Sequence, residues 1–404
     1  MIKKEIVLLK KSSKFVDYYE SDALVDRLNA LYIRIINDLK DKSPEIAFEM
    51  MLNFLDLHKN TLERVEDSKG RVSEVFCTAC NELHSISRDT DHLNNQALVE
   101  IIFTRFMDND YGIYDDIIHS FKDILKDQDF HLLKEKFKNV VNNKNTEVVK
   151  FGLKSIADCK NNVDEYISAC AFNSDIYTYD HLEIAKRLIK HLRPKEAIEW
   201  LDHMKIPMDH PWNQHKKDLK IQALELDGNY EQVQKERLSW FSETLNPKLY
   251  DEILKAAKPD FKNIFISDAI NKAFQFQEPH TGLGFLVLIK EFEELAKFVH
   301  ARCNELNGRQ FYILRLAADF LQKTDPIAAT LLYRKMIDVV LNKAKSKYYD
   351  HAAKDLEKCG TLDSKIEYWG ALESHREYLK SIEIKHKKKI SFWFEYTSVL
   401  QKKY

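Results

Sequence analysis

The stretch ALELDGNYEQVQKERLSWF, residues 223–241, shows how this chain is built. Polar residues Asp227, Gly228 and Asn229 separate two segments whose apolar residues recur at helical spacing. Glycine and asparagine suit a tight turn, because both tolerate backbone conformations that most residues avoid. The bulky Trp240 near the end of the second segment provides apolar surface for a neighbouring layer. The stretch therefore predicts a helical hairpin with a short turn.

Three other segments show a polar turn followed by an amphipathic helix, at 193–201, 290–299 and 325–337. Their corresponding positions are separated by 36, 63 and 33 residues, in the order Ala197, Val233, Ala296 and Ala329. We expect one more hairpin in the double gap, at 247–275. A period in the mid-thirties is typical of antiparallel helix pairs, which cannot bury their apolar faces alone and must stack.

Residues 178–341 resemble the tetratricopeptide class, most clearly in the segment 223–241. The tryptophan, glycine and tyrosine pattern of the full motif is not kept in each unit, so the resemblance is to the general architecture. It implies an all-α fold, an α-α superhelix of helical hairpins. Curved stacks of this kind present a concave surface that binds a protein or a peptide.

The last eighty residues carry a second resemblance, in LLYRKMIDVVLNKAKSKYYDHAAKDLEK at 331–358 and HREYLKSIEIKHKKKISFW at 375–393. These segments resemble the C-terminal part of a bacterial all-helical family of unassigned function. Related segments follow the zinc finger in some SWIM-type proteins. This chain has no Cys-x-Cys followed by Cys-x-His, so the nucleic-acid role of that finger is not implied.

Composition supports helices. The 404 residues include only 9 Gly and 8 Pro, so folds that need many tight turns, such as sandwiches and barrels, are disfavoured. The Ser43-Pro44-Glu45 sequence marks a helix start, with Ser43 as cap.

We expect an N-terminal helical region at 1–172, helical repeats at 173–345, and capping helices with a basic patch at 346–404. Further N-terminal helices are predicted at 21–39, 68–87, 93–108, 112–126, 128–142, 146–158 and 162–172.

The basic segment KHKKKISFWF, at 385–394, is the best candidate for contact with a partner. Lysines there could neutralise phosphates while an aromatic residue supplies stacking surface. The alternative is a solvated lysine run before a helix that caps the last repeat. The candidate partner-binding residues are Lys385, Lys387, Lys388, Lys389 and Trp393. Lys343, Lys345 and Lys347 could widen the patch.

Two groups of residues could hold a metal. Cys77, Cys80 and His84 fall on one helical face, with His92 as a possible fourth ligand. The alternative is that VFCTACNEL is a buried helical stripe, in which small thiols are common. His203, His210 and His215 cluster in a segment with two prolines, where the alternative is a polar loop between repeats. We commit to no metal ligand and no cofactor.

No phosphate-binding loop, dinucleotide fingerprint, kinase signature or Gly-x-Ser-x-Gly elbow occurs. The glycine pair in Thr281-Gly-Leu-Gly284 lacks a preceding strand and is expected to begin a helix. Apolar stretches are too short for a signal peptide or a bilayer span, so we expect a cytoplasmic protein that makes no contact with a membrane.

The leading hypothesis is a non-catalytic intracellular scaffold that binds a protein or peptide. The alternatives are a nucleic-acid-associated protein using the basic patch and a metalloprotein with a Cys/His site.

Overall fold

A computed structural model describes residues 2–87, 95–207 and 209–401. The prediction of an all-α fold is confirmed, because the described residues form helices and turns without a strand. The only β-type pairing in those ranges is an isolated bridge between Val16 and Val65. None of the helices there has the length and apolar character that crossing a bilayer requires.

The chain divides into two compact units, residues 1–227 and residues 228–404. The boundary falls in the Asp227-Gly228-Asn229 turn. Gly228 has φ of 73°, a left-handed conformation that glycine adopts without steric cost. The predicted division of the chain into three regions, with boundaries at 172 and 345, stays a prediction. The tetratricopeptide-like superhelix stays a prediction as well.

Unit 1 consists of helices joined by short turns. They are α1 (Ile2–Lys11), α2 (Ser21–Leu39), α3 (Pro44–Leu55), α4 (His58–Leu62), α5 (Arg71–Ser87), α6 (Asn95–Met107), α7 (Ile117–Ser120), α8 (Asp127–Val140), α9 (Thr146–Cys159), α10 (Val163–Cys170), α11 (Thr178–Lys190), α12 (Pro194–His203) and α13 (Asn213–Leu226).

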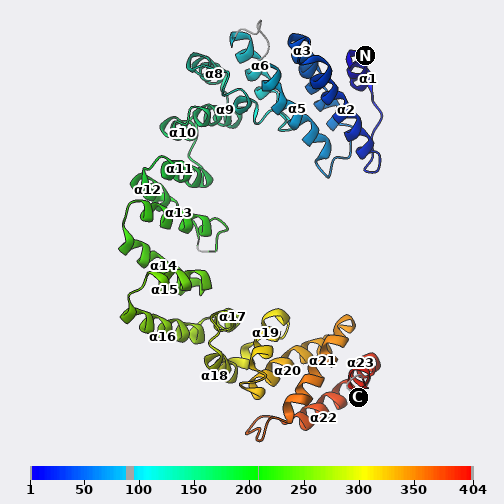
Figure 1. Cartoon of the computed structure of the whole chain (residues 1–404), viewed down its shortest axis with the longest axis vertical. Coiled ribbons are helices and arrows are strands. Elements are labelled where there is room, and N and C mark those ends of the chain that lie inside the picture. The colour runs from blue at the N-terminus through cyan, green and yellow to red at the C-terminus, as the bar shows by residue number, and fades with distance from the viewer. Residues whose placement is uncertain (1, 88–94, 208, 402–404) are drawn as a thin grey trace. The chain divides into compact units, whose positions relative to one another are not determined.

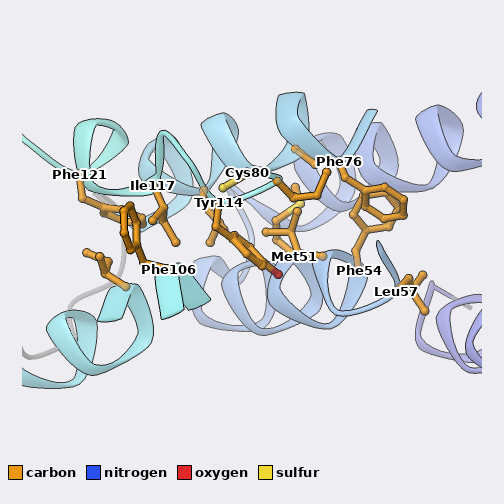
Figure 2. Packing of buried hydrophobic residues seen from close by; sticks show 14 of the residues in the cluster. Met51, Phe54, Leu57, Phe76, Cys80, Phe106, Tyr114, Ile117 and Phe121 are labelled. Atoms are coloured by element: carbon orange, nitrogen blue, oxygen red, sulfur yellow. The ribbon is translucent and has the colours of Figure 1, made fainter. Parts of the chain in front are cut away.

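Helices α1 to α9 share a continuous hydrophobic core, part of which Figure 2 shows. The rings of Phe54 in α3 and Phe76 in α5 lie 5.3 Å apart between centroids. Helix α3 begins at Pro44, as predicted, but the Ser43 side chain makes no capping hydrogen bond. A second core cluster runs through α10 to α13.

The continuous helix predicted at 112–126 is wrong. Only the short helix α7 (Ile117–Ser120) forms there, because the side chain of Asn109 takes a hydrogen bond from a backbone N–H group that a continuous helix would use. The Asn109 side-chain oxygen accepts a hydrogen bond from the Tyr114 backbone N–H at 2.9 Å. Gly112, with φ of 71°, then turns the chain in a conformation that no helix contains.

Unit 2 continues the series of helices. They are α14 (Tyr230–Thr244), α15 (Pro247–Ala256), α16 (Pro259–Gln275), α17 (Pro279–Ile289), α18 (Phe292–Arg302), α19 (Phe311–Leu321), α20 (Pro326–Asn342), α21 (Tyr349–Asp363), α22 (His375–His386) and α23 (Ile390–Gln401), with short 3₁₀ turns at Cys303–Glu305 and Ser346–Tyr348.

Helices of unit 2 pack on their sequence neighbours and on the helix after next. Helix α17 contacts α16 and α18 and also α15 and α19, while α18 contacts α20. Two helices, α15 and α16, lie at 247–275 as predicted, but they are not the expected hairpin, because α15 packs mainly on α14 and α16 packs mainly on α17. Thr281-Gly-Leu-Gly284 lies in the first turns of α17. Of the corresponding repeat positions, Ala329 is buried, whereas Ala296 is only partly buried and its neighbour Leu295 is buried.

The end of unit 2 is a bundle in which α21 packs against both α20 and α23 (Figure 1). Tyr349, at the start of α21, meets Phe392, at the start of α23, with ring centroids 5.7 Å apart. The starts of these two helices therefore adjoin. The connection before each start is rich in lysine, so the bundle carries two lysine-rich connections at one end.

Candidate partner-binding site

The predicted partner-binding residues lie in and around the turn between α22 and α23. Lys385 is in the last turn of α22, Lys387 to Lys389 form the connection, and Trp393 is in the first turn of α23. Within the described residues, no ion pair or side-chain hydrogen bond engages the four ammonium groups. The charge of this basic turn, residues 385–389, is therefore left for solvent or a partner.

Large apolar side chains are exposed beside the basic turn. Ile390 is 79% exposed and Phe394, one helical turn further along α23, is 70% exposed. Ile384, in α22, is exposed as well. Large apolar side chains this exposed are candidates for contact with another molecule. We name Ile384, Ile390 and Phe394 the apolar stripe.

The opposite face of the same two helices is buried. Phe392 is fully buried against Tyr349, and Ile382 of α22 is also in the core. Both helices pack on α21, so they cap unit 2, as the alternative interpretation of the segment expected. That interpretation expected Phe394 to pack as well, but Phe394 is exposed. Contact of the lysines with a partner stays a prediction.

Trp393 supports the turn and is only half exposed. Its indole Nε1–H donates to the His386 carbonyl oxygen at 3.0 Å, and its ring packs edge-on against Phe392 with centroids 4.9 Å apart. Burial lowers the pKa of His386, and the neighbouring Lys385 and Lys389 lower it further. Phe394 offers more free aromatic surface than Trp393, which the sequence singled out.

A second lysine-rich connection approaches the same end. It joins α20 to α21 and contains Lys343, Lys345 and Lys347. The Lys347 Nζ lies 4.9 Å from the centroid of the Tyr348 ring and the Lys345 Nζ lies 6.0 Å from it, within the range of cation–π attraction. The prediction that this loop widens the basic patch remains a prediction, and the Tyr349 contact with Phe392 supports it.

An apolar cavity opens next to this loop, between α19, α20 and α21. Its volume is about 110 Å³. Met336, Val340 and Ala352 form the buried walls, and Phe311 and Tyr348 form the rim, with ring centroids 5.9 Å apart. The polar lining residues are Arg315, His351 and Asp355. We name this the α19–α21 pocket.

One ion pair fixes the polar side of the α19–α21 pocket. Arg315 Nη2 donates to Asp355 Oδ2 at 2.5 Å, and the Asp355 side chain is only 4% exposed. Burial raises the pKa of Asp355, and the adjacent Arg315 opposes that rise. The carboxylate is therefore occupied by its partner, whereas the guanidinium keeps other N–H donors beside the cavity.

The cysteine candidates lie inside the core of unit 1. Cys77 and Cys80 are both in α5, and Cys80 is buried among apolar residues that include Met51 and Tyr114 (Figure 2). Burial raises the pKa of Cys80 to about 12, so this thiol is protonated at neutral pH. His84 bonds locally through Nδ1 to the Asn81 carbonyl at 2.5 Å. The fourth candidate, His92, lies outside the described residues.

The three histidines of the proline-containing segment occupy different surroundings. His203 Nδ1 contacts the Glu199 carbonyl at 2.7 Å, and the side chain lines a surface pocket with His181 and Trp200. The His210 ring accepts a hydrogen bond from the Trp212 backbone N–H at 3.2 Å, and His215 is in α13. Across the described ranges no group of three or more His, Cys, Asp or Glu residues is arranged to hold a metal.

Comparison with known families identifies the family of this chain. A family of unknown function, DUF6880, matches residues 1–147 and 138–395. The chain belongs to this family. The expectation of a family with unassigned function is thereby confirmed. No curated protein and no solved structure matches the chain.

The α19–α21 pocket is what the sequence interpretation missed. Its lining comes from four separate elements between Phe311 and Asp355, and no short motif joins them. The one signal in the sequence was the lysine-rich loop before Tyr348, which was interpreted only as part of a basic surface.

Proposed function

We propose that this protein is a non-catalytic intracellular scaffold of helical hairpins, and that the outer face of α22 and α23 binds a protein or peptide partner. One observation carries the proposal: three large apolar side chains are exposed near four lysines that form no ion pair with a described residue. Leaving such groups exposed costs free energy that a bound partner would recover.

The chemistry of this face defines the partner. Its apolar groups must meet the apolar stripe, and its carboxylates must face Lys385, Lys387 and Lys388, whose side chains are exposed. We infer a partner surface in which aliphatic or aromatic residues alternate with aspartate or glutamate. Apolar contact supplies most of the affinity, while the charges set orientation and association rate.

The test compares three forms of the full chain as baits in affinity capture from native cells, followed by binding assays with the purified partner. The variant Ile390→Asp/Phe394→Asp places carboxylates on the apolar stripe without touching the core. The control, Leu192→Asp, changes an equally exposed leucine in unit 1. We expect the stripe variant to lose a partner that the wild type and the control both bind, with a loss of at least about tenfold in affinity. A partner that binds all three forms equally contradicts the proposal.

A nucleic-acid-associated role is the second candidate, because the ammonium groups of the basic turn form no ion pair with a residue that the structure describes and could contact phosphates. Four phosphate contacts on duplex DNA predict a slope of log K against log salt of about −3.6.

The variant Lys387→Glu/Lys388→Glu/Lys389→Glu should abolish such binding. A duplex and a single strand, each tested in low salt, distinguish the forms of nucleic acid. Absence of binding to both at low salt would remove this candidate, and binding unaffected by the charge reversal would place it elsewhere on the chain.

A further inference from the structure

We propose that the α19–α21 pocket binds an apolar carboxylate, an aromatic or aliphatic group of about benzene size that carries a carboxyl group. This site is separate from the apolar stripe and needs no protein partner at the basic turn. The same chemistry occurs in a small organic acid and in the last residue of a polypeptide, and the experiment below separates these two sources.

The size and lining of the cavity point to an apolar group. Apolar cavities on the order of 150 Å³ bind benzene, and this one, of about 110 Å³, is open at the Phe311 and Tyr348 rim, so a ring can enter without filling it alone. Met336, Val340 and Ala352 present only apolar atoms at the base. Water has few partners there, so its displacement by an apolar group is favourable.

The charges around the cavity select an anion. The carboxylate of Asp355 is buried and already bonded to Arg315. The cations at the opening are Arg315, at 31% side-chain exposure, and the ammonium groups of Lys345 and Lys347 over the Tyr348 ring. The exposed carboxylate of Asp350, 4.0 Å from His351, is paired with Lys354 at 3.4 Å. A ligand ammonium would meet these three cations, whereas a carboxylate would be attracted by them.

The hydrogen-bonding groups fit a carboxylate in the same way. Within the described residues, Arg315 makes a single hydrogen bond, through Nη2, so Nε and Nη1 keep free donors. The ring of His351 lines the mouth of the cavity, and its Nε2 lies 4.0 Å from Asp350 Oδ2, beyond hydrogen-bond distance. Charge-assisted bonds of an arginine to a carboxylate are among the strongest that a protein offers.

The experiment titrates the full chain with four small probes and measures binding by calorimetry and by saturation-transfer NMR. N-acetyl-L-phenylalanine carries both ring and carboxylate, its primary amide lacks the charge, phenethylamine reverses it, and acetate lacks the ring. We expect N-acetyl-L-phenylalanine to bind at least about tenfold more tightly than any of the other three. Equal binding of the acid and the amide, or no binding of the acid, overturns the proposal.

Three variants test whether the acid binds in the α19–α21 pocket. Val340→Phe fills the cavity, and Lys347→Glu reverses a charge at its rim without disturbing the core. Lys354→Glu is the matched control, because Lys354 is also an exposed lysine of unit 2. Neither lysine lines the cavity, but Lys347 lies over the ring of the rim residue Tyr348, whereas Lys354 pairs with Asp350. The first two variants should weaken binding of the acid by about tenfold or more and the control should not. Equal effects of Lys347→Glu and Lys354→Glu contradict the assigned location, and the rim variant keeps the test valid if Val340→Phe does not fold.

A peptide pair identifies the source of the ligand. A seven-residue peptide ending in phenylalanine is compared with the same peptide carrying a C-terminal amide. A free-acid peptide that binds more tightly than N-acetyl-L-phenylalanine indicates a polypeptide terminus, and a peptide that is excluded while the small acid binds indicates a small organic acid. Both results support the carboxylate chemistry, and a peptide pair with equal affinities argues against it.

Discussion

Arg315 in α19 and Asp355 in α21, forty positions apart, form an ion pair of 2.5 Å at the edge of an apolar cavity. The carboxylate is almost wholly buried, whereas the guanidinium still reaches solvent. The pair links two helices that the chain places on either side of α20. Asp355 therefore depends on a partner that only the packing of unit 2 brings to it.

Replacing Arg315 with leucine should reduce the free energy of unfolding by about 2–3 kcal/mol, because a buried carboxylate loses its counter-charge. Burial already raises the pKa of Asp355, so the folded state binds its proton more readily than the unfolded state. The loss should thus be larger at pH 8 than at pH 5. Urea unfolding at both values measures it, and Arg315→Leu/Asp355→Leu should recover most of the stability. A loss that is the same at both pH values would contradict this account.

Two glycines of one motif should respond in opposite ways to alanine. A methyl group at Gly282 would lie 2.3 Å from the Ala273 carbonyl oxygen of α16, whereas at Gly284 the nearest atom is 3.6 Å away. Gly282→Ala should destabilise the protein by about 1–3 kcal/mol. Gly284→Ala should be neutral or stabilise by up to about 1 kcal/mol through helix propensity. The melting temperatures of both variants test this prediction. Equal changes in the two variants would mean that α16 and α17 do not pack this closely.

Phe392 and Phe394 separate stability from binding in the C-terminal helix. Phe392→Ala removes a fully buried ring and should cost about 3–5 kcal/mol, with increased amide exchange in α23 as it detaches from α21. Phe394→Ala changes an exposed residue and should alter stability by less than about 0.5 kcal/mol. Hydrogen exchange and urea unfolding measure both. Comparable losses in the two variants would show that the exposed face of α23 is in fact covered in the folded chain.

Stability should fall in mildly acidic solution through His375. Burial lowers the pKa of this histidine below 6.5, and nearby Arg334 lowers it further. The unfolded state then binds the proton more readily, so the free energy of unfolding decreases as pH falls through 6.5 toward the folded-state pKa. His375→Asn should show a smaller decrease between pH 7.5 and 5.5, though not none, because the pKa of His386 is lowered too. An unchanged slope in the variant would rule out this contribution.

The thiol of Cys80 should be inert in the native protein. Its burial and its pKa of about 12 keep it protonated, so a thiol reagent at pH 8 should modify it only after unfolding. Mass spectrometry after brief labelling gives the modified positions. The same preparation, analysed for metals, should contain less than one zinc per chain. Stoichiometric zinc that is lost in Cys80→Ala would instead support the metalloprotein alternative.

Local signals in the sequence located most helices correctly. The polar turns and the spacing of apolar residues predicted the helices of the second half, including the two at 247–275 that were inferred only from a gap. The pairing was predicted less well: α11 packs on α12, α17 on α18 and α19 on α20, but the unit boundary falls inside the predicted hairpin at 223–241. The prediction failed at 112–126, where a side chain took over a backbone hydrogen-bond donor. Asn109 is three residues before Gly112, and no periodicity argument includes a bond of that kind.

The candidate binding face was only half visible in the sequence. The lysines of the basic turn could be read directly, because a run of charge is almost always solvated. The orientation of the aromatic residues could not: Phe392, Trp393 and Phe394 are consecutive, yet one is buried, one is half-buried and one is exposed.

By itself, the sequence determined that this chain forms helical hairpins, because helix periodicity, turn residues and capping act over a few residues. It also fixed where positive charge accumulates. Only the tertiary structure decided which groups meet: Arg315 with Asp355, Tyr349 with Phe392, and the walls of the α19–α21 pocket. The physical reason is that these contacts depend on how whole helices pack, and side chains forty residues apart come together through the sum of many small burial energies that no single stretch contains.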